Sequence, residues 1–177
     1  MSDPAYLPAR FTRAGDRIVA ELAVTLDNPV HEVWAALTEP DRLAQWLAPG
    51  RIELREGGVA RLDFADSGIV IDSTVTAVEP MRRLEYSWSG PNEPQRPVRW
   101  DLEPIGPVTR LVLELSVPAE EDAARSAAGW AAHLEMLTAL LVGVPTRFPF
   151  PTFQAARAAY GAQLAAMASG RPTAAAG

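Results

Sequence analysis

Hydrophobic and polar residues alternate along much of the chain before residue 118, which is the pattern of strands with one buried face. Short turns separate most of these segments, and this favours an antiparallel meander over parallel strands joined by helices. Seven segments are predicted to be strands: 17–26, 52–54, 60–64, 69–78, 84–88, 98–103 and 109–117. Within 69–78 the pattern is ambiguous, because Ile69, Ile71 and Val75 fit one face whereas Val70 and Val78 fit the other.

Helical spacing appears between the first two strands and again after the last. Asn28 and Pro29 predict a helix start, with Asn28 capping the free amides and Pro29 at the first helical position. A second short helix is expected over 41–47. The longest helical pattern spans 123–142, where Trp130, Leu134, Leu137 and Leu141 fall on one stripe.

This order of elements predicts an α+β domain, a curved antiparallel sheet closed by one long helix. We divide the chain into an N-terminal segment (1–16), the domain (17–144) and a C-terminal extension (145–177). The prolines at 145, 149 and 151 are expected to exclude regular structure up to about Thr152. A short helix through Tyr160 and a frayed tail are expected to follow.

Composition removes several function classes. The chain of 177 residues has no cysteine, and all 16 basic residues are arginine, which excludes thiolate, disulfide and lysine Schiff-base chemistry. A formal charge of −6 disfavours binding to nucleic acid or to anionic membrane surfaces. We expect a cytoplasmic protein, since neither a membrane span nor a signal-peptide stretch is evident.

An ordered set of short motifs resembles the family of activators of the heat-shock-protein-90 ATPase, over about residues 18–141. The set comprises Pro29-Val30-x-x-Val33-Trp34-x-Ala36-Leu37-Thr38, then Pro40, Leu43 and Trp46, Gly57-Gly58, 75–80, Arg83-Leu84-x-Tyr86-x-Trp88, 109–111 and Gly129-Trp130-x-x-x-Leu134-x-x-Leu137. The resemblance implies a helix-grip (START-like) fold with a pocket between the sheet and the long helix. Related families of this superfamily bind lipids, hormones or polyketides, and a few catalyse cyclisation.

Aromatic residues expected to face the concave side of the sheet are the main candidates for a ligand-binding cavity. The candidate set is Phe64, Tyr86, Trp88, Trp100, Trp130, His133 and Leu137. The competing interpretation is that these side chains are simply core. His133 could donate to a ligand carbonyl or act as a general acid, or it could be a partly exposed helix residue.

The remaining candidates give weaker signals. Asp72 would mark a functional site if it pointed inward, but an outward surface position is favoured. His31 is expected to face solvent, and two histidines on separate helices are weak grounds for a metal site. No catalytic residue, metal or cofactor is therefore assigned.

Three functions remain open at this point. The first is non-covalent binding of a small hydrophobic or aromatic molecule in the cavity. The second is a co-chaperone-like or regulatory protein interaction, or a homodimer formed through the C-terminal extension. The third is cyclase or hydrolase chemistry using His133, Tyr86 or an inward Asp72, which nothing in the sequence demands.

Overall fold

The computed structural model describes residues 4–170. Its strands are β1 (Ala9–Ala14), β2 (Arg17–Leu26), β3 (Gly50–Ile52), β4 (Val59–Phe64), β5 (Ile69–Glu79), β6 (Arg83–Ser87), β7 (Pro97–Ile105) and β8 (Val108–Pro118). Its helices are α1 (Val30–Thr38), α2 (Pro40–Trp46), α3 (Ala123–Leu141) and α4 (Phe150–Ala168).

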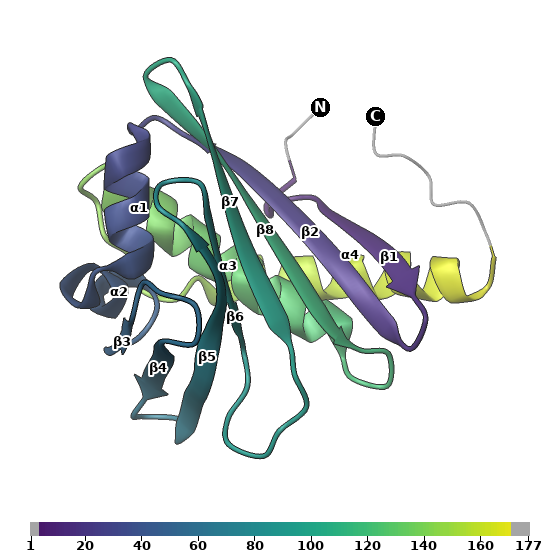
Figure 1. The fold of residues 1–177 in the computed structure, drawn as a ribbon. Helices are drawn as coiled ribbons and strands as arrows, with labels where there is room; N and C mark the ends of the chain where they lie inside the picture. The colour runs from purple at the N-terminus through teal and green to yellow at the C-terminus, as the bar shows by residue number, and fades with distance from the viewer. Residues whose placement is uncertain (1–3, 171–177) are drawn as a thin grey trace.

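All eight strands join one antiparallel sheet in the order β1-β2-β8-β7-β6-β5-β4-β3. α3 lies across one face of this curved sheet, and α2 lies near β3, with α1 next to α2 (Figure 1). The predicted α+β helix-grip fold, with two short helices and a long closing helix, is confirmed.

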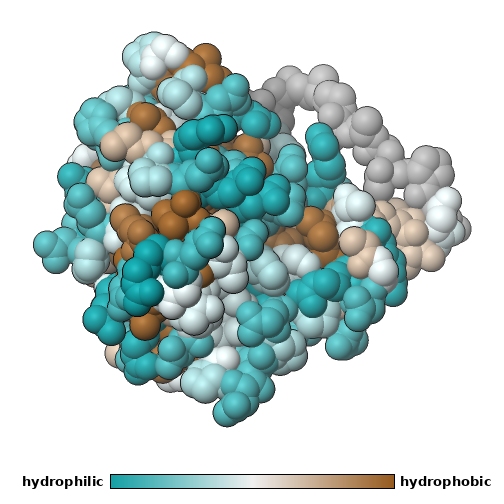
Figure 2. Space-filling view, in the orientation of Figure 1, coloured by the Kyte–Doolittle hydropathy of each residue, from teal (hydrophilic) through white to brown (hydrophobic). Residues whose placement is uncertain are grey.

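Strict alternation along the central strands builds the core. In β8, Leu111, Leu113 and Leu115 are buried, and the residues between them are half-buried on the other face. Leu134 and Leu137 of α3 are buried within the same core cluster. Fully burying a leucine side chain contributes about 1.5–3 kcal/mol, so this stripe fixes which face of the sheet α3 covers. Figure 2 shows the opposite face as mostly hydrophilic, with separate apolar patches.

A β-bulge explains the ambiguous pattern of β5. The register shifts between Val75 and Ala77, so the strand changes phase by one residue. Ile71 and Val75 point inward before the bulge, whereas Val78, paired with the buried Leu84, packs against the core after it. Inward residues therefore occupy odd positions before the bulge and an even position after it, whereas Ile69 at the start of the strand is exposed.

The start of α1 differs from the prediction. Pro29 is the N-cap residue, and no side chain caps the helix. The Asn28 side-chain amide instead donates to Glu32 Oε2 (2.9 Å) and to the Leu141 carbonyl (3.0 Å). Asn28 thus connects α1 to the end of α3 rather than capping a helix, because the tertiary fold brings the Leu141 carbonyl within its reach.

The sequence pattern missed one element and underestimated the length of another. β1 forms within the N-terminal segment and pairs with β2 along its whole length, although Phe11 is its only buried residue. One buried position gives no alternation to detect. The helix after the prolines is also not short: α4 has 19 residues and begins at Phe150, before Thr152. Pro151 lies in the first turn, where a missing N–H costs no hydrogen bond.

α4 packs against α3 and against the N-terminal segment. Tyr160 stacks edge-on to Tyr6 and Phe11 and donates a hydrogen bond to the Leu7 carbonyl. Gln163 donates to the Ala9 carbonyl at 3.0 Å. These contacts join α4 to the N-terminal segment. The expected frayed tail lies outside the described residues. Within residues 4–170, no helix is both long and apolar enough to cross a membrane.

Candidate ligand-binding site

Four rings from three parts of the fold meet between the sheet and α3. Phe64 ends β4, Trp88 directly follows β6, and Trp130 and His133 lie one turn apart on α3. Neighbouring ring centroids are 5.8 Å (Phe64–Trp88), 4.7 Å (Trp88–Trp130), 6.1 Å (Trp130–His133) and 6.3 Å (His133–Phe64). These distances close a circuit of contacts, and we call these four residues the aromatic cluster.

The other candidates lie deeper. Trp100 packs beneath the cluster, with its ring 5.5 Å from Trp130 and 6.0 Å from Trp46. Tyr86 and Leu137 are fully buried core residues. Burial raises the pKa of the Tyr86 phenol to about 12, with its hydrogen-bonding neighbour Trp100 opposing the shift. The structure therefore brings all the predicted aromatic positions to one region, and only Phe64, Trp88 and His133 are half-buried.

His133 is oriented by a backbone group. Its Nδ1 lies 3.0 Å from the Trp46 carbonyl oxygen, and a carbonyl can only accept, so Nδ1 carries the proton. Burial lowers the pKa of His133 below its ordinary value, while the hydrogen bond to Trp46 opposes the shift. The neutral ring then presents Nε2 as an acceptor. Of the two possibilities considered from the sequence, this argues against the donor role, since a neutral Nε2 cannot donate to a ligand carbonyl.

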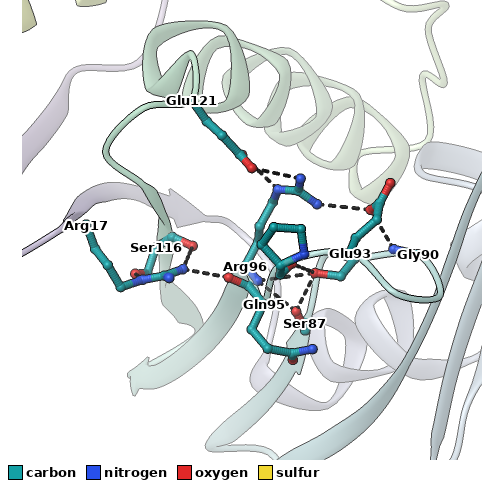
Figure 3. Close-up of polar contacts among 10 residues, drawn as sticks. Arg17, Ser87, Gly90, Glu93, Gln95, Arg96, Ser116 and Glu121 are labelled. Carbon is teal, nitrogen blue, oxygen red and sulfur yellow. Dashed lines mark hydrogen bonds and ion pairs between the residues drawn. The ribbon is translucent and has the colours of Figure 1, made fainter.

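The loop between β6 and β7 holds Trp88 in place. Trp88 donates its backbone N–H to the Arg96 carbonyl at 2.8 Å. The Arg96 guanidinium forms two 2.8 Å bonds to Glu121 and one 3.0 Å bond to Glu93, and Glu93 also accepts from the Gly90 N–H (Figure 3). Paired N–H···O bonds fix both distance and orientation, so the loop is tied to the segment that precedes α3.

A second set of contacts ties the same loop to the sheet. The Ser87 hydroxyl accepts from the Arg96 N–H at 2.8 Å and also hydrogen-bonds to Ser89 at 2.8 Å. Arg17 of β2 donates to the Gln95 carbonyl and to Ser116 of β8, as Figure 3 shows. The half-buried Trp88 therefore stands at the base of a loop fixed on two sides.

Sequence reasoning missed two residues that complete the site. Trp46 supplies the carbonyl that orients His133, and its indole N–H donates to the Ala36 carbonyl at 2.7 Å. Phe148, from the connection between α3 and α4, packs edge-on against His133 with ring centroids 5.4 Å apart. The Phe-Pro-Phe-Pro run at 148–151 is a signal that could have drawn attention to Phe148, but its target is visible only in three dimensions.

The weaker candidates lie elsewhere. Asp72 is exposed and pairs with Arg61 at 3.1 Å, which agrees with the favoured outward orientation. His31 is exposed on α1. Among residues 4–170, no three histidine, cysteine, aspartate or glutamate side chains gather in a way that could hold a metal ion.

Two hollows in the surface lie away from the aromatic cluster. One, of about 480 Å³, is lined mainly by charged side chains of β6, β7 and β8, including Arg83, Asp101 and Arg110. The other, of about 460 Å³, is mostly apolar and lies between residues 4–7, Val24 and α3. None of the seven candidate residues lines either of these two hollows.

Comparisons with known proteins agree with this architecture. No protein with curated annotation matches the chain in sequence. CalU16 from Micromonospora echinospora is 29% identical, with 88% of this chain and 94% of that chain covered and a TM-score of 0.69. DynU16, a protein in the dynemicin biosynthetic locus, is 34% identical over 76% of this chain and 51% of that chain, with a TM-score of 0.66. EF2215 from Enterococcus faecalis, a conserved protein of unknown function, shares the fold at 21% identity, with 89% and 90% covered and a TM-score of 0.72.

The family model described as Activator of Hsp90 ATPase homolog 1-like protein matches residues 27–142. This range includes the whole aromatic cluster and all strands from β3 to β8. The chain therefore belongs to the Activator of Hsp90 ATPase homolog 1-like family, within the helix-grip superfamily.

Proposed function

We propose that this chain binds a small hydrophobic or aromatic molecule at the aromatic cluster, between the sheet and α3. One observation carries the proposal: Phe64, Trp88 and His133 form part of a closed circuit of rings yet remain half-buried. Aromatic side chains with one positioned polar atom are typical of small-molecule sites. Members of this fold family commonly bind hydrophobic ligands, and similarity to a protein from a biosynthetic locus is compatible with such a ligand.

Native mass spectrometry of protein purified from its own host tests whether a ligand is carried. A fluorescence titration with 2-methoxynaphthalene, a neutral aromatic probe, then tests the site. Phe64→Ala should weaken probe binding by roughly 2- to 10-fold, because one aromatic contact is worth about 0.5–1.5 kcal/mol.

Ile69→Ala is the matched control, since Ile69 is the cross-strand partner of Phe64 but is 54% exposed. Its affinity for the probe should equal that of the wild type. The apolar hollow beside α3 is the competing location, and Ala139→Phe would fill it. If Ala139→Phe lost probe binding while Phe64→Ala kept the wild-type affinity, the probe would bind in that hollow and not at the aromatic cluster. Absence of binding by the wild type would reject the proposal.

A second candidate is self-association through the connection between α3 and α4. Val142, Val144 and Phe150 are 58%, 63% and 64% exposed within this short segment. Exposed apolar side chains that form one contiguous patch are typical of interaction surfaces. Light scattering should then show a dimer that Val144→Glu converts to a monomer, and a monomeric wild type would exclude this candidate.

A further inference from the structure

Phe148 is the only ring of the α3–α4 connection that contacts the aromatic cluster in the described part of the chain. Residues 142–147 around it are exposed. From Pro145 to Phe148, no backbone N–H donates to another backbone group among the described residues. Phe148 is instead held by its ring contacts with His133, Phe150 and Phe153, and by its carbonyl, which accepts from the Phe150 N–H at 3.1 Å.

His133 presents an unused acceptor next to that ring. Nδ1 is occupied by the Trp46 carbonyl, and Nε2 has no hydrogen-bond partner among residues 4–170. Within the same range, Asn28 Oδ1 is the one side-chain nitrogen or oxygen that is fully buried without a partner. His133 Nε2 therefore keeps access to solvent or to a ligand.

We propose that the Phe148 ring lies where the aromatic ring of a bound ligand would lie. The ligand is a neutral hydroxylated aromatic molecule whose O–H donates to His133 Nε2. This inference rests on the proposed function and gives it a ligand class. The aromatic ring of the ligand would make the same kind of edge-on contact with His133 that Phe148 makes. A lone pair at Nε2 requires a donor, so a phenol or similar alcohol fits, whereas a carboxylate of comparable size does not.

Displacement of Phe148 also accounts for how a ligand reaches rings that already contact one another. The connection would swing outward about Gly143, which has a φ of +79° that favours glycine. α3 and α4 themselves need not move, because the connection lies outside both helices. Phe148 thus competes with the ligand for the contact with His133.

The experiment uses the full-length protein and two probes that differ only at the donor, 2-naphthol and 2-methoxynaphthalene. Wild-type protein should bind 2-naphthol roughly 2- to 10-fold more tightly, the usual effect of one net hydrogen bond. Phe148→Ala should tighten binding of both probes by roughly 2- to 10-fold, because the competing ring contact is gone. Val144→Ala, at a 63% exposed position of the same connection, should leave the affinities unchanged.

His133→Phe should abolish the preference for 2-naphthol while leaving 2-methoxynaphthalene bound. Should that variant fail to fold, the ¹⁵N chemical shift of His133 Nε2 in the wild type is the alternative measurement, and only 2-naphthol should move it strongly. Equal affinities for the two probes, with an unmoved Nε2 shift, would overturn the ligand class. Unchanged affinity in Phe148→Ala would overturn the role of Phe148, whereas absence of binding by every form would reject the proposed function itself.

Discussion

The surroundings of His133 determine the protonation state of its imidazole ring. Its Nδ1 is committed to a backbone carbonyl, and no charged group contributes to its lowered pKa among the described residues. Burial therefore lowers the pKa of His133, and the hydrogen bond to Trp46 opposes that shift. A neutral imidazole with one free acceptor nitrogen is the result, and it is the feature that distinguishes this cluster from ordinary core.

This shift makes stability depend on pH. Because the pKa of His133 is lowered on folding, the unfolded chain takes up a proton first as pH falls through about 6.5. The free energy of unfolding should then decrease as pH falls, by up to about 1.4 kcal/mol per pH unit between the unfolded and folded pKa. Urea titrations of wild type and His133→Gln between pH 7.5 and 5 measure it. Identical slopes for the two proteins would show that His133 does not titrate this way.

Tyr160 gives a second test at this scale. Its hydroxyl donates to the Leu7 carbonyl, and burial raises its pKa. Tyr160→Phe should lower the free energy of unfolding by about 0.5–1.5 kcal/mol, because that carbonyl loses its donor. Tyr6→Phe is the matched control, since its hydroxyl makes no hydrogen bond among the described residues, and chemical denaturation at pH 7 compares the two. A Tyr6→Phe loss as large as that of Tyr160→Phe would contradict the argument.

At the scale of elements, the β6–β7 loop is held by charge-assisted bonds rather than by apolar packing. Glu121, beside the start of α3, bonds to Arg96 of this loop, and Arg17 of β2 donates to the Gln95 carbonyl. The pKa of Arg96 is raised, chiefly by its hydrogen bond to Glu121. The loop thus acts as a rigid support for Trp88.

Arg96→Ala should therefore lower stability and loosen the aromatic cluster together. Loss of a hydrogen-bonded charged group costs about 1–3 kcal/mol, and Trp88 should become more mobile. Near-ultraviolet circular dichroism of the tryptophans, alongside a denaturation curve, reports both effects. Arg82→Ala is the control, since Arg82 is 74% exposed and reaches Glu79 only at 4.0 Å. A normal tryptophan signal in Arg96→Ala would show that the loop does not need this support.

At the scale of the whole molecule, the two ends of the chain close the structure on one side. β1 extends the sheet, and α4 covers both β1 and part of α3 through Tyr160, Phe153 and Ala156. The family match ends at residue 142, so α4 lies outside the part shared with the family model. This arrangement makes the extension an integral part of the domain surface.

A chain that ends at Val144 tests this arrangement. It should remain folded, because the core shared with the family is intact. Its free energy of unfolding should fall by several kcal/mol, since exposing about 100 Å² of apolar surface costs about 2.5 kcal/mol. It should also bind aromatic probes at least as well as Phe148→Ala, because Phe148 is absent. Thermal unfolding and the 2-methoxynaphthalene titration measure the two effects. Unchanged stability would mean that α4 contributes nothing to the domain.

Most of the fold could be read from local patterns. The central strands bury alternate residues, α3 buries one stripe, and both signals persist over many residues. β1 and the length of α4 could not be read in this way. β1 has one buried residue, and α4 is rich in alanine and stabilised by packing on α3 and the N-terminal segment.

The sequence by itself determined the fold class, the inward aromatic set and the exclusion of cysteine and lysine chemistry, because composition and periodicity act locally along the chain. Only the tertiary structure decided which rings remain half-buried, which nitrogen of His133 is free, and that the Phe148 ring packs against the His133 ring. These properties depend on a carbonyl from Trp46 and a ring from the α3–α4 connection, which lie far from each other in sequence and meet at His133 only after the chain has folded.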